Sequence, residues 1–486
     1  MSAILRSEAE PIVAGHVNDT AFLSATDLVE AFRAGTLSPV EAVEAALNRI
    51  LTHDKAINAF TLIDAEAARS AARESEKRWR SNAPLGLLDG VPLSVKDTLS
   101  VKGYPFRRGS RAASNNPAEE NAPSVQRAFN HGAIFIGITT TPEFGCGPVT
   151  NSPLTGITRN PWDTSKTSGG SSGGAAASIA AGMGHLALGT DAGGSIRIPS
   201  GLCGVVGMKP TGGIVASYPI SVAGNLATAG PIARNVRDAA LLLSAIAGPD
   251  PRDFDSHPAG EADYLVGLDD GVAGMRIAFS PTLGYAQKLD PEVRDRVYAA
   301  VQLLGTLGAE IEEVDPGFDN PIKAYVDLFH AGIAFALRNF SSEQRELLSD
   351  TVRNAVAAGA NVTLTDYLHA QEVRRNLLRK MAEFHERFDL LVTPTVAVPA
   401  FTAGRSTPED FASFPDMRAW TPFCYPFNLT QQPAISVPCG LTASGLPVGL
   451  HIIGPRYHDR DVMRAAYAYE RNRPSVLLPN LPASDD

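Results

Sequence analysis

Strand-like apolar runs that alternate with helix-like stretches constrain the fold of this chain more than any other feature. A helical pattern over 291–304, for example, separates two of the runs. Because strands joined through helices pair into a sheet that the helices cover, the alternation predicts an α/β layered fold. The order of the strands in the sheet does not follow from the sequence. The strand-like runs are 91–96, 133–137, 276–279, 309–314, 389–393, 434–437 and 448–453.

The N-terminal part of the chain has a helical pattern. Two helices are predicted over 24–34 and 38–51, and the second opens with Ser-Pro-Val-Glu, a capping box with proline at the first helical position. We expect residues 1–75 to form a helical region that packs either on the core or against a second copy in a homodimer. These helices supply no residues with obvious chemistry.

The rest of the chain is long enough for a large core. The protein has 486 residues, of which 44% are hydrophobic. We expect residues 76–480 to form the main domain. Within it, residues 321–387 have a helical pattern without a strand, which predicts a helical insertion that shapes a pocket beside the functional site. An ordinary structural subdomain is the alternative for this segment.

Two serines lie in glycine-rich runs. Ser171 lies in Ser-Gly-Gly-Ser-Ser-Gly-Gly (168–174), and Ser195 lies in Gly-Thr-Asp-Ala-Gly-Gly-Ser-Ile-Arg (189–197). The first run is unlike a linker, because it continues into alanine-rich sequence that suits a tightly packed helix. It also lacks the Gly-Lys-Ser/Thr ending of a phosphate-binding loop. Its glycines would let the backbone at Ser171 approach other segments closely, which a serine that bridges two side chains requires.

Lys96 ends one of the apolar runs and is the candidate base. A neutral lysine amine can take the proton of a serine hydroxyl, but its ordinary pKa near 10.4 leaves about one amine in a few thousand neutral at pH 7. Burial lowers a lysine pKa by up to roughly 3 to 5 units, and the apolar run predicts that Lys96 enters an interior. Lys96, Ser171 and Ser195 together therefore predict a hydrolase site that needs no histidine.

The run 191–195 presents successive backbone N–H groups with little side chain in the way. Such a loop can form an oxyanion hole, in which the loss of one donor costs about 3 to 4 kcal/mol of transition-state stabilisation. Asp191 and Arg197 flank the nucleophile region. Two interpretations are open for them: an ion pair that holds the loop, and contacts with the substrate.

These motifs resemble the amidase signature family of serine hydrolases. The resemblance is dense over about 80–245, where it includes Lys96 and both glycine-rich runs, and it is scattered as far as about 470. Several separate motifs in the same order make a chance match improbable. The further matching motifs are Thr-Arg-Asn-Pro-Trp-Asp (158–163), Gly-Met-Lys-Pro-Thr (207–211), Gly-Pro-Ile-Ala-Arg (230–234), Phe-Asp-Leu-Leu-Val-Thr-Pro-Thr (388–395) and Pro-Ala-Ile-Ser-Val-Pro (433–438).

The resemblance implies a fold and a role for each motif. The fold would be a single large mixed β-sheet with helices on both faces. Ser195 matches the nucleophile, Ser171 the serine that follows a cis peptide bond and relays protons, and Lys96 the base. The implied activity is hydrolysis of an amide C–N bond through an acyl-enzyme on Ser195, without a cofactor or a metal. The backbone of the family's oxyanion hole matches Ala192, Gly193 and Gly194.

The substrate is less defined than the chemistry. The family's glutaminase subunit of the tRNA-dependent amidotransferase usually has Tyr-Gly-Arg-Val-Ser and Ser-Leu-Asp-Gln-Ile-Gly stretches, and this chain has neither within 212–230. The aromatic stretch 420–428 instead favours a pocket for small aryl or alkyl amides. Carbamates (urethanes) and esters share the same carbonyl chemistry and stay open as substrates. A catalytically silent binding module is the alternative of another class, and the intact Lys96, Ser171 and Ser195 argue against it.

Charge and the remaining motifs exclude several functions. The net charge is −10 and no basic run is present, so we expect neither a nucleic acid nor a membrane as partner. The N-terminus has no signal-peptide core and no run of about 18 apolar residues follows, which predicts a cytoplasmic protein that acts on a small molecule. Four scattered cysteines and ten histidines without a close pair indicate no disulfide framework and no zinc site.

Overall fold

The computed structural model describes residues 19–258, 263–413, 418–474 and 478–481. The expectation about a signal peptide falls on residues 1–18, which lie outside these ranges. None of the helices in the described ranges combines the length and the apolar character that crossing a membrane requires.

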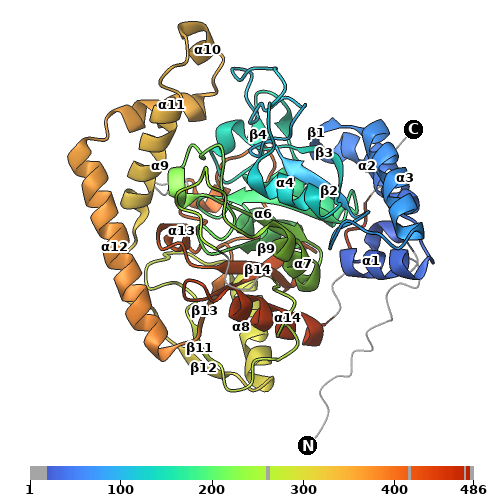
Figure 1. Cartoon of the computed structure of the whole chain (residues 1–486). Coiled ribbons are helices and arrows are strands. Elements are labelled where there is room, and N and C mark those ends of the chain that lie inside the picture. Colours follow the sequence, from blue (N-terminus) through green and yellow to red (C-terminus); the bar gives the residue numbers. More distant parts are fainter. Residues whose placement is uncertain (1–18, 259–262, 414–417, 475–477, 482–486) are drawn as a thin grey trace, which may run out of the picture.

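One sheet of eleven strands runs through the described chain and confirms the predicted mixed β-sheet (Figure 1). The strands from β8 to β13 pair antiparallel, and parallel pairs flank them at β3–β2–β8 and at β13–β11–β12. In spatial order the strands are β1 (Phe60–Ile63), β3 (Ile134–Thr139), β2 (Pro92–Lys96), β8 (Leu186–Asp191), β10 (Thr228–Ala233), β9 (Val206–Lys209), β14 (Ala434–Leu441), β15 (Pro447–Ile453), β13 (Leu390–Pro394), β11 (Arg276–Phe279) and β12 (Glu310–Glu313).

Both faces of this sheet are covered, and the strand sequences show why. In β8, Leu186 and Leu188 belong to one core, whereas Ala187 between them belongs to the other. Successive strand residues point to opposite faces, so a strand covered on both sides is apolar along its whole length. Helices α4 (Pro123–Asn130), α7 (Val236–Ile246), α8 (Pro291–Thr306) and α14 (Asp459–Asn472) contribute to the first core, and α2 (Pro39–Ile57), α5 (Gly173–Ala180) and α6 (Arg197–Cys203) lie on the opposite face.

The N-terminal region is part of this sheet. The capping box of α2 is present: Ser38 Oγ accepts from Glu41 N at 3.2 Å, and the Glu41 carboxylate accepts from Ser38 N at 2.8 Å. After α2, however, the chain forms β1, which pairs antiparallel with β3 at the edge of the sheet. The expected boundary at residue 75 falls inside a helix. Four strand residues between two helices give too short a pattern for sequence reasoning to find. The two other helices of the region are α1 (Ala25–Ala34) and α3 (Ala65–Arg80).

Three central strands were not predicted from the sequence. The β8 and β10 sequences contain several glycines and alanines, and β10 also contains a proline, whereas β9 is four residues long. None of them has the run of β-branched and aromatic residues that favours a strand. Their pairing on both sides supplies what their propensity lacks. Two small hairpins lie outside the large sheet, formed by β4 (Asn151–Ser152) with β5 (Gly156–Ile157) and by β6 (Arg159–Asn160) with β7 (Asp163–Thr167).

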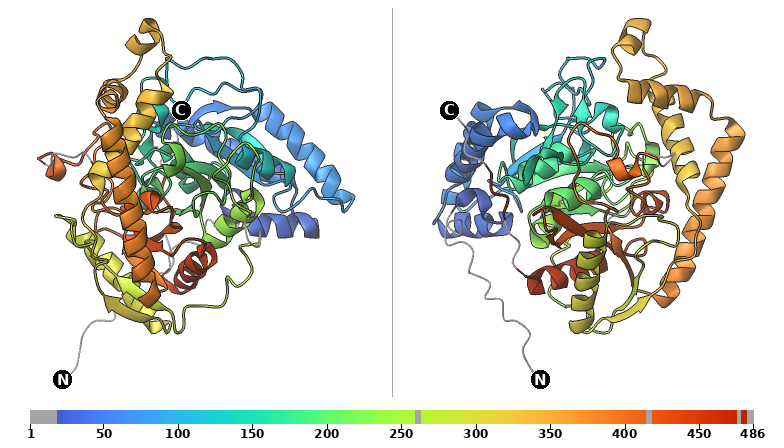
Figure 2. Two further views of the ribbon diagram at one scale, coloured as in Figure 1. Left: turned by 60° about the vertical axis from the view of Figure 1, so that its left-hand side comes forward. Right: turned by 180° about the vertical axis from the view of Figure 1, so that it is seen from behind.

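A group of helices separates β12 from β13 and lies along one side of the molecule (Figures 1 and 2). It is joined to the body through a shared apolar cluster, in which Tyr325 and Phe329 pack with Ile198 of α6. This packing brings the group beside the loop that follows β8. The helices are α9 (Ile322–Ala336), α10 (Ser342–Glu346), α11 (Asp350–Ala360) and α12 (Leu364–Arg387), and a short α13 (Pro426–Leu429) follows later in the chain.

Candidate active site

Lys96 is the last residue of β2, and its side chain is completely buried. Its Nζ lies 2.8 Å from Ser171 Oγ, 3.0 Å from Thr190 Oγ1 and 3.4 Å from the Thr190 carbonyl oxygen. Burial lowers the pKa of Lys96 to about 7, and the charge of Asp191 only partly opposes this shift. A substantial fraction of the amine is therefore neutral near pH 7. The interior environment that the apolar run predicted for Lys96 is present.

Ser171 lies just before α5, after a cis peptide bond between Gly170 and Ser171. The glycines around it are needed for packing. A Cβ on Gly170 would lie 2.7 Å from the Val149 carbonyl carbon, and a Cβ on Gly173 would lie 2.3 Å from Thr150 Oγ1. The glycine-rich run is therefore a closely packed segment of the core, as expected, and neither a linker nor a phosphate loop.

Ser195 lies in the loop between β8 and α6 and is partly exposed. It lines two small cavities: Ser171 and Thr190 line the first, and Gly193 lines the second. The backbones of the two serine motifs are joined directly, because Ser172 N donates to the Ser195 carbonyl oxygen at 2.9 Å. Ser195 thus shares a cavity with Ser171, whose hydroxyl contacts Lys96.

A buried ion pair holds the loop that carries Ser195. The Asp191 carboxylate accepts hydrogen bonds from Gly194 N at 2.7 Å, from Ile196 N at 3.1 Å, and from Nε and Nη2 of Arg197, each at 2.9 Å. Burial raises the pKa of Asp191, but the charge and hydrogen bonds of Arg197 outweigh it and hold the pKa below its usual range. The carboxylate is therefore ionised whenever the protein is folded near neutral pH.

Arg197 has no donor left over for a substrate. Its Nη1 donates to the Cys424 carbonyl oxygen and to His451 Nε2, each at 3.1 Å, and its Nη2 also donates to Asn428 Oδ1 at 2.7 Å. The side chain is fully buried. Of the two interpretations of Asp191 and Arg197, the structure selects the ion pair that holds the loop.

In the described loop 191–195, one backbone N–H group is hydrogen-bonded to Asp191 and others are free. Because Gly194 N donates to Asp191, it is not available as the oxyanion donor that the resemblance implied for Gly194. In the described chain, the N–H groups of Ala192, Gly193 and Ser195 have no protein acceptor. A Cβ on Gly193 would lie 2.1 Å from the Tyr325 hydroxyl, so α9 covers this part of the loop closely.

The cavity walls correct the expectation for the aromatic stretch 420–428. Its four aromatic side chains, Trp420, Phe423, Tyr425 and Phe427, are buried in the core and line neither cavity. Their rings pack among other apolar residues, because an aromatic side chain has a large apolar area whose burial in the core is strongly favourable. The aromatic residues that do line the cavities come from other segments: Phe106, Phe144, Tyr218, Tyr325 and Phe329.

Sequence reasoning missed several residues of the site. Thr190, which contacts Lys96 Nζ, lies inside the recognised Gly-Thr-Asp motif, where a polar residue at the end of a buried strand is the available signal. Tyr325 and Phe329 carry no such signal, since an aromatic residue on a helix usually packs in a core. Asn428 and His451, which hold Arg197, lie 231 and 254 residues from it in sequence, so no local pattern links them to it.

Histidines and metal ligands do not enter this geometry. None of the described histidines lines either cavity. His185, in the motif region, is fully buried with Nε2 3.0 Å from the Thr20 carbonyl oxygen, which is a structural position. Over the described ranges, no three His, Cys, Asp or Glu side chains are grouped so that they could hold a metal ion.

Comparison with known proteins agrees with the fold and the motifs. The amidase family profile matches residues 41–463, so the chain belongs to the amidase family, and specifically to the amidase signature enzymes. It is 37% identical to an acylamidase of Rhodococcus erythropolis over 93% of this chain and 96% of that protein. It is also 35% identical to a glutamyl-tRNA(Gln) amidotransferase subunit of Chloroflexus aggregans, over 93% and 96%.

A solved structure gives the same result. The chain superimposes on a bacterial aryl acylamidase of the amidase signature family with a TM-score of 0.86 and 31% identity, covering 93% of this chain and 96% of that one. Family membership and these similarities establish an enzyme that hydrolyses amide bonds.

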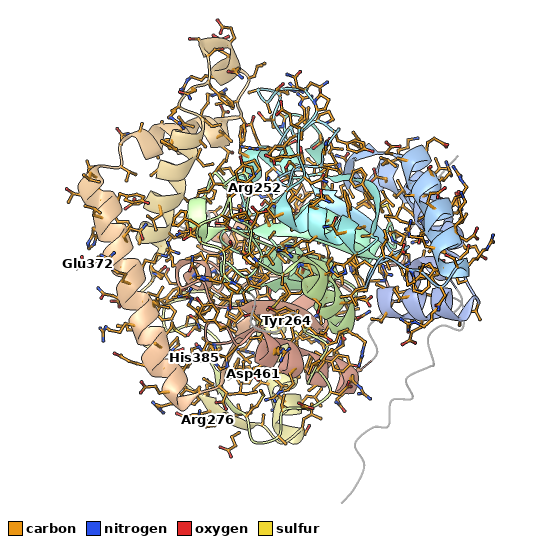
Figure 3. All side chains as sticks on the ribbon, viewed as in Figure 1. Arg252, Tyr264, Arg276, Glu372, His385 and Asp461 are labelled. Atoms are coloured by element: carbon orange, nitrogen blue, oxygen red, sulfur yellow. The ribbon has the colours of Figure 1, made fainter. Side chains whose placement is uncertain are left out.

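The buried ion pair yields a stability prediction. Arg197→Met leaves the Asp191 charge buried without its partner, so we expect a loss of about 3 to 5 kcal/mol in unfolding free energy. The control is Arg276→Met, which breaks the exposed ion pair between Arg276 and Asp389 at the periphery of the molecule (Figure 3). That change should cost about 0 to 1 kcal/mol. Urea titration followed by circular dichroism measures both, and equal, small losses would contradict the role given to Arg197.

Proposed function

We propose that this enzyme cleaves small aryl or alkyl amides through an acyl-enzyme on Ser195, with Ser171 as proton relay and Lys96 as base. One observation carries the proposal: the buried amine of Lys96 lies 2.8 Å from Ser171 Oγ, and Ser171 lines the same cavity as the partly exposed Ser195. The backbone N–H groups of Ala192, Gly193 and Ser195, which have no protein acceptor in the described chain, are suited to receive the oxyanion.

The surroundings of Lys96 suit its neutral form. A neutral amine has two hydrogens and one lone pair. Thr190 offers two oxygens, Oγ1 and the carbonyl, for the hydrogens, and the lone pair can then accept the Ser171 hydroxyl proton. Thr98 Oγ1 lies 3.0 Å from Thr190 Oγ1 and can orient that hydroxyl. Each proton of the relay therefore has an acceptor.

The reaction then proceeds in two halves. Lys96 takes the Ser171 proton while Ser171 takes the Ser195 proton, and Ser195 Oγ bonds to the substrate carbonyl carbon. The tetrahedral intermediate collapses, the C–N bond breaks, and Ser171 returns a proton to the leaving nitrogen while protonated Lys96 gives its proton back to Ser171. Water attacks the acyl-enzyme in the second half, losing its proton through the same relay, and Ser195 leaves with a proton. The enzyme is regenerated and the acid and the amine are released.

The alternative substrates would be cleaved by the same proposed relay of Ser195, Ser171 and Lys96. The acylamidase and aryl acylamidase similarities support aryl or alkyl amides. The similarity to a glutamyl-tRNA(Gln) amidotransferase component keeps open, as the second candidate, a glutaminase-type subunit of such an enzyme, against which the departures over 212–230 argue. Carbamates and esters would use the same relay with a different leaving group.

The nucleophile assignment is tested by substitution. Ser195→Ala deletes the attacking atom and little volume, so we expect a loss of at least about a thousandfold in kcat for anilides, without unfolding. Lys96→Ala should also be severely impaired. The matched control is Ser178→Ala, a buried serine in α5 whose hydroxyl, among the residues the structure describes, bonds to the Ala175 carbonyl oxygen alone. Labelling by a fluorophosphonate should be lost in Ser195→Ala and kept in the control. Near-normal turnover by Ser195→Ala would remove Ser195 from its role.

The pKa of Lys96 predicts the pH profile. Its protonated form is inactive as a base, and its pKa is lowered to about 7, so kcat/KM should rise about tenfold per pH unit below pH 7 and level off above it. Lys209 is also buried with a pKa lowered to about 7, but it lines neither cavity. Lys209→Met should therefore keep the same midpoint if it folds, and EDTA should change nothing. A profile that falls as pH rises from 6 to 8 would contradict Lys96 as base.

The substrate class is tested with primary amides, which share ammonia as leaving group. Because the walls of both cavities include several aromatic rings, benzamide and short aliphatic amides should have a higher kcat/KM than glutamine. One buried CH₂ contributes only about 0.8 kcal/mol, so the preference among apolar amides should be broad. Glutamine as the best substrate, with apolar amides inert, would make the glutaminase-type function the leading candidate.

A further inference from the structure

Arg108 lies at the wall of the first cavity, the one that contains Ser171 and Ser195. Its guanidinium carbon lies 4.4 Å from the centre of the Phe106 ring, and Phe106 lines the same cavity. Its backbone is held in the left-handed region with φ of 54°, and its carbonyl oxygen accepts from Phe144 N at 2.7 Å. The guanidinium plane is thus held against an aromatic ring at the edge of the site.

The charge of Arg108 has no salt bridge among the described residues. Asp97 is the acidic residue whose charge interacts with Arg108. Its carboxylate, however, already accepts hydrogen bonds from Arg107 N at 3.1 Å and from Gly109 N at 2.8 Å. Burial also raises the pKa of Asp97 to about 6, which weakens it as a counter-ion. A guanidinium that is partly buried without a paired carboxylate is unfavourable unless another anion binds there.

The two cavities suggest which half of a substrate meets Arg108. In the proposed mechanism Ser171 hands its proton to the leaving nitrogen, so the amine half must lie on the Ser171 side of Ser195. Ser171 and Arg108 line the first cavity together, whereas Gly193, Ile198 and Tyr325 line the second. The acyl half therefore fits the second cavity, and the amine half extends toward Arg108.

We propose that Arg108 binds a carboxylate on the amine half of the substrate, so that the preferred substrates are amides of anionic amines, such as N-acyl aminobenzoates. This inference rests on the proposed function, because it uses the direction of the relay to orient the substrate. A guanidinium presents a planar pair of donors that matches a carboxylate, and stacking on Phe106 orients that plane. The apolar preference of the acyl half is unaffected.

The test compares two substrates that differ by one carboxylate, 4-acetamidobenzoate and acetanilide. For each protein the ratio of their kcat/KM values is measured, and the change in this ratio between proteins cancels intrinsic reactivity and any general loss of activity. Hydrogen bonds to a charged group are strong enough that Arg108→Gln should lower the ratio roughly ten- to hundredfold. The control is Arg107→Gln on the same loop. Its guanidinium bonds to Asn115 Oδ1 and the Ser110 carbonyl oxygen, each at 3.3 Å, and lines neither cavity, so the ratio should not change.

A binding measurement separates this inference from the proposed function. Calorimetry with Ser195→Ala should show 4-acetamidobenzoate binding more tightly than acetanilide, and the difference should disappear in the double variant Ser195→Ala, Arg108→Gln. This arm holds even if the wild type turns over neither amide, which would count against the proposed function alone. A carboxylate preference that survives Arg108→Gln, or no preference in either protein, overturns the inference. So does a preference found only on the acyl half, for 4-carbamoylbenzoate over benzamide.

Discussion

The buried carboxylate of Asp191 is the group on which the rest of the site depends. It lies at the end of β8 and accepts hydrogen bonds from the loop backbone and from Nε and Nη2 of Arg197. A buried charge is tolerated only when such partners surround it, so the loop cannot relax without exposing an unpaired ion. Its geometry determines which backbone N–H groups are free beside Ser195 and which one, at Gly194, is not.

The same carboxylate also interacts electrostatically with Lys96, the proposed base. Burial alone would lower the pKa of Lys96 still further, and Asp191 moderates the shift so that the amine titrates close to neutral pH. A general base is most effective when its pKa lies near the working pH. The parallel pairing of β2 with β3 and β8 places Lys96 in the interior and close to Asp191, which ends β8. The sheet therefore sets both the position and the basicity of the amine.

The proposed relay and the cavity walls come from different parts of the chain. Of the proposed relay residues, Lys96 ends β2, Ser195 follows β8 and Ser171 precedes α5. The cavity walls come instead from the segment around Phe106, the segment around Tyr218, and α9 with Tyr325 and Phe329. Loops and added helices vary more freely than a sheet that is buried on both faces. Variation in such walls around one fold is a physical reason why similar chains carry names as different as acylamidase and amidotransferase subunit.

Sequence alone determined the α/β class and seven of the eleven strands of the large sheet, and it predicted the three polar residues of the proposed relay, because apolar periodicity and glycine-framed motifs are local signals. It did not reveal that Gly194 N is bound to Asp191, or that Trp420 and Phe427 belong to the core rather than to a cavity. Strands as weak in propensity as β8 were also missed. Only the tertiary structure decided these points, because hydrogen-bond partners and burial depend on segments that are distant in sequence and meet only when the sheet is assembled.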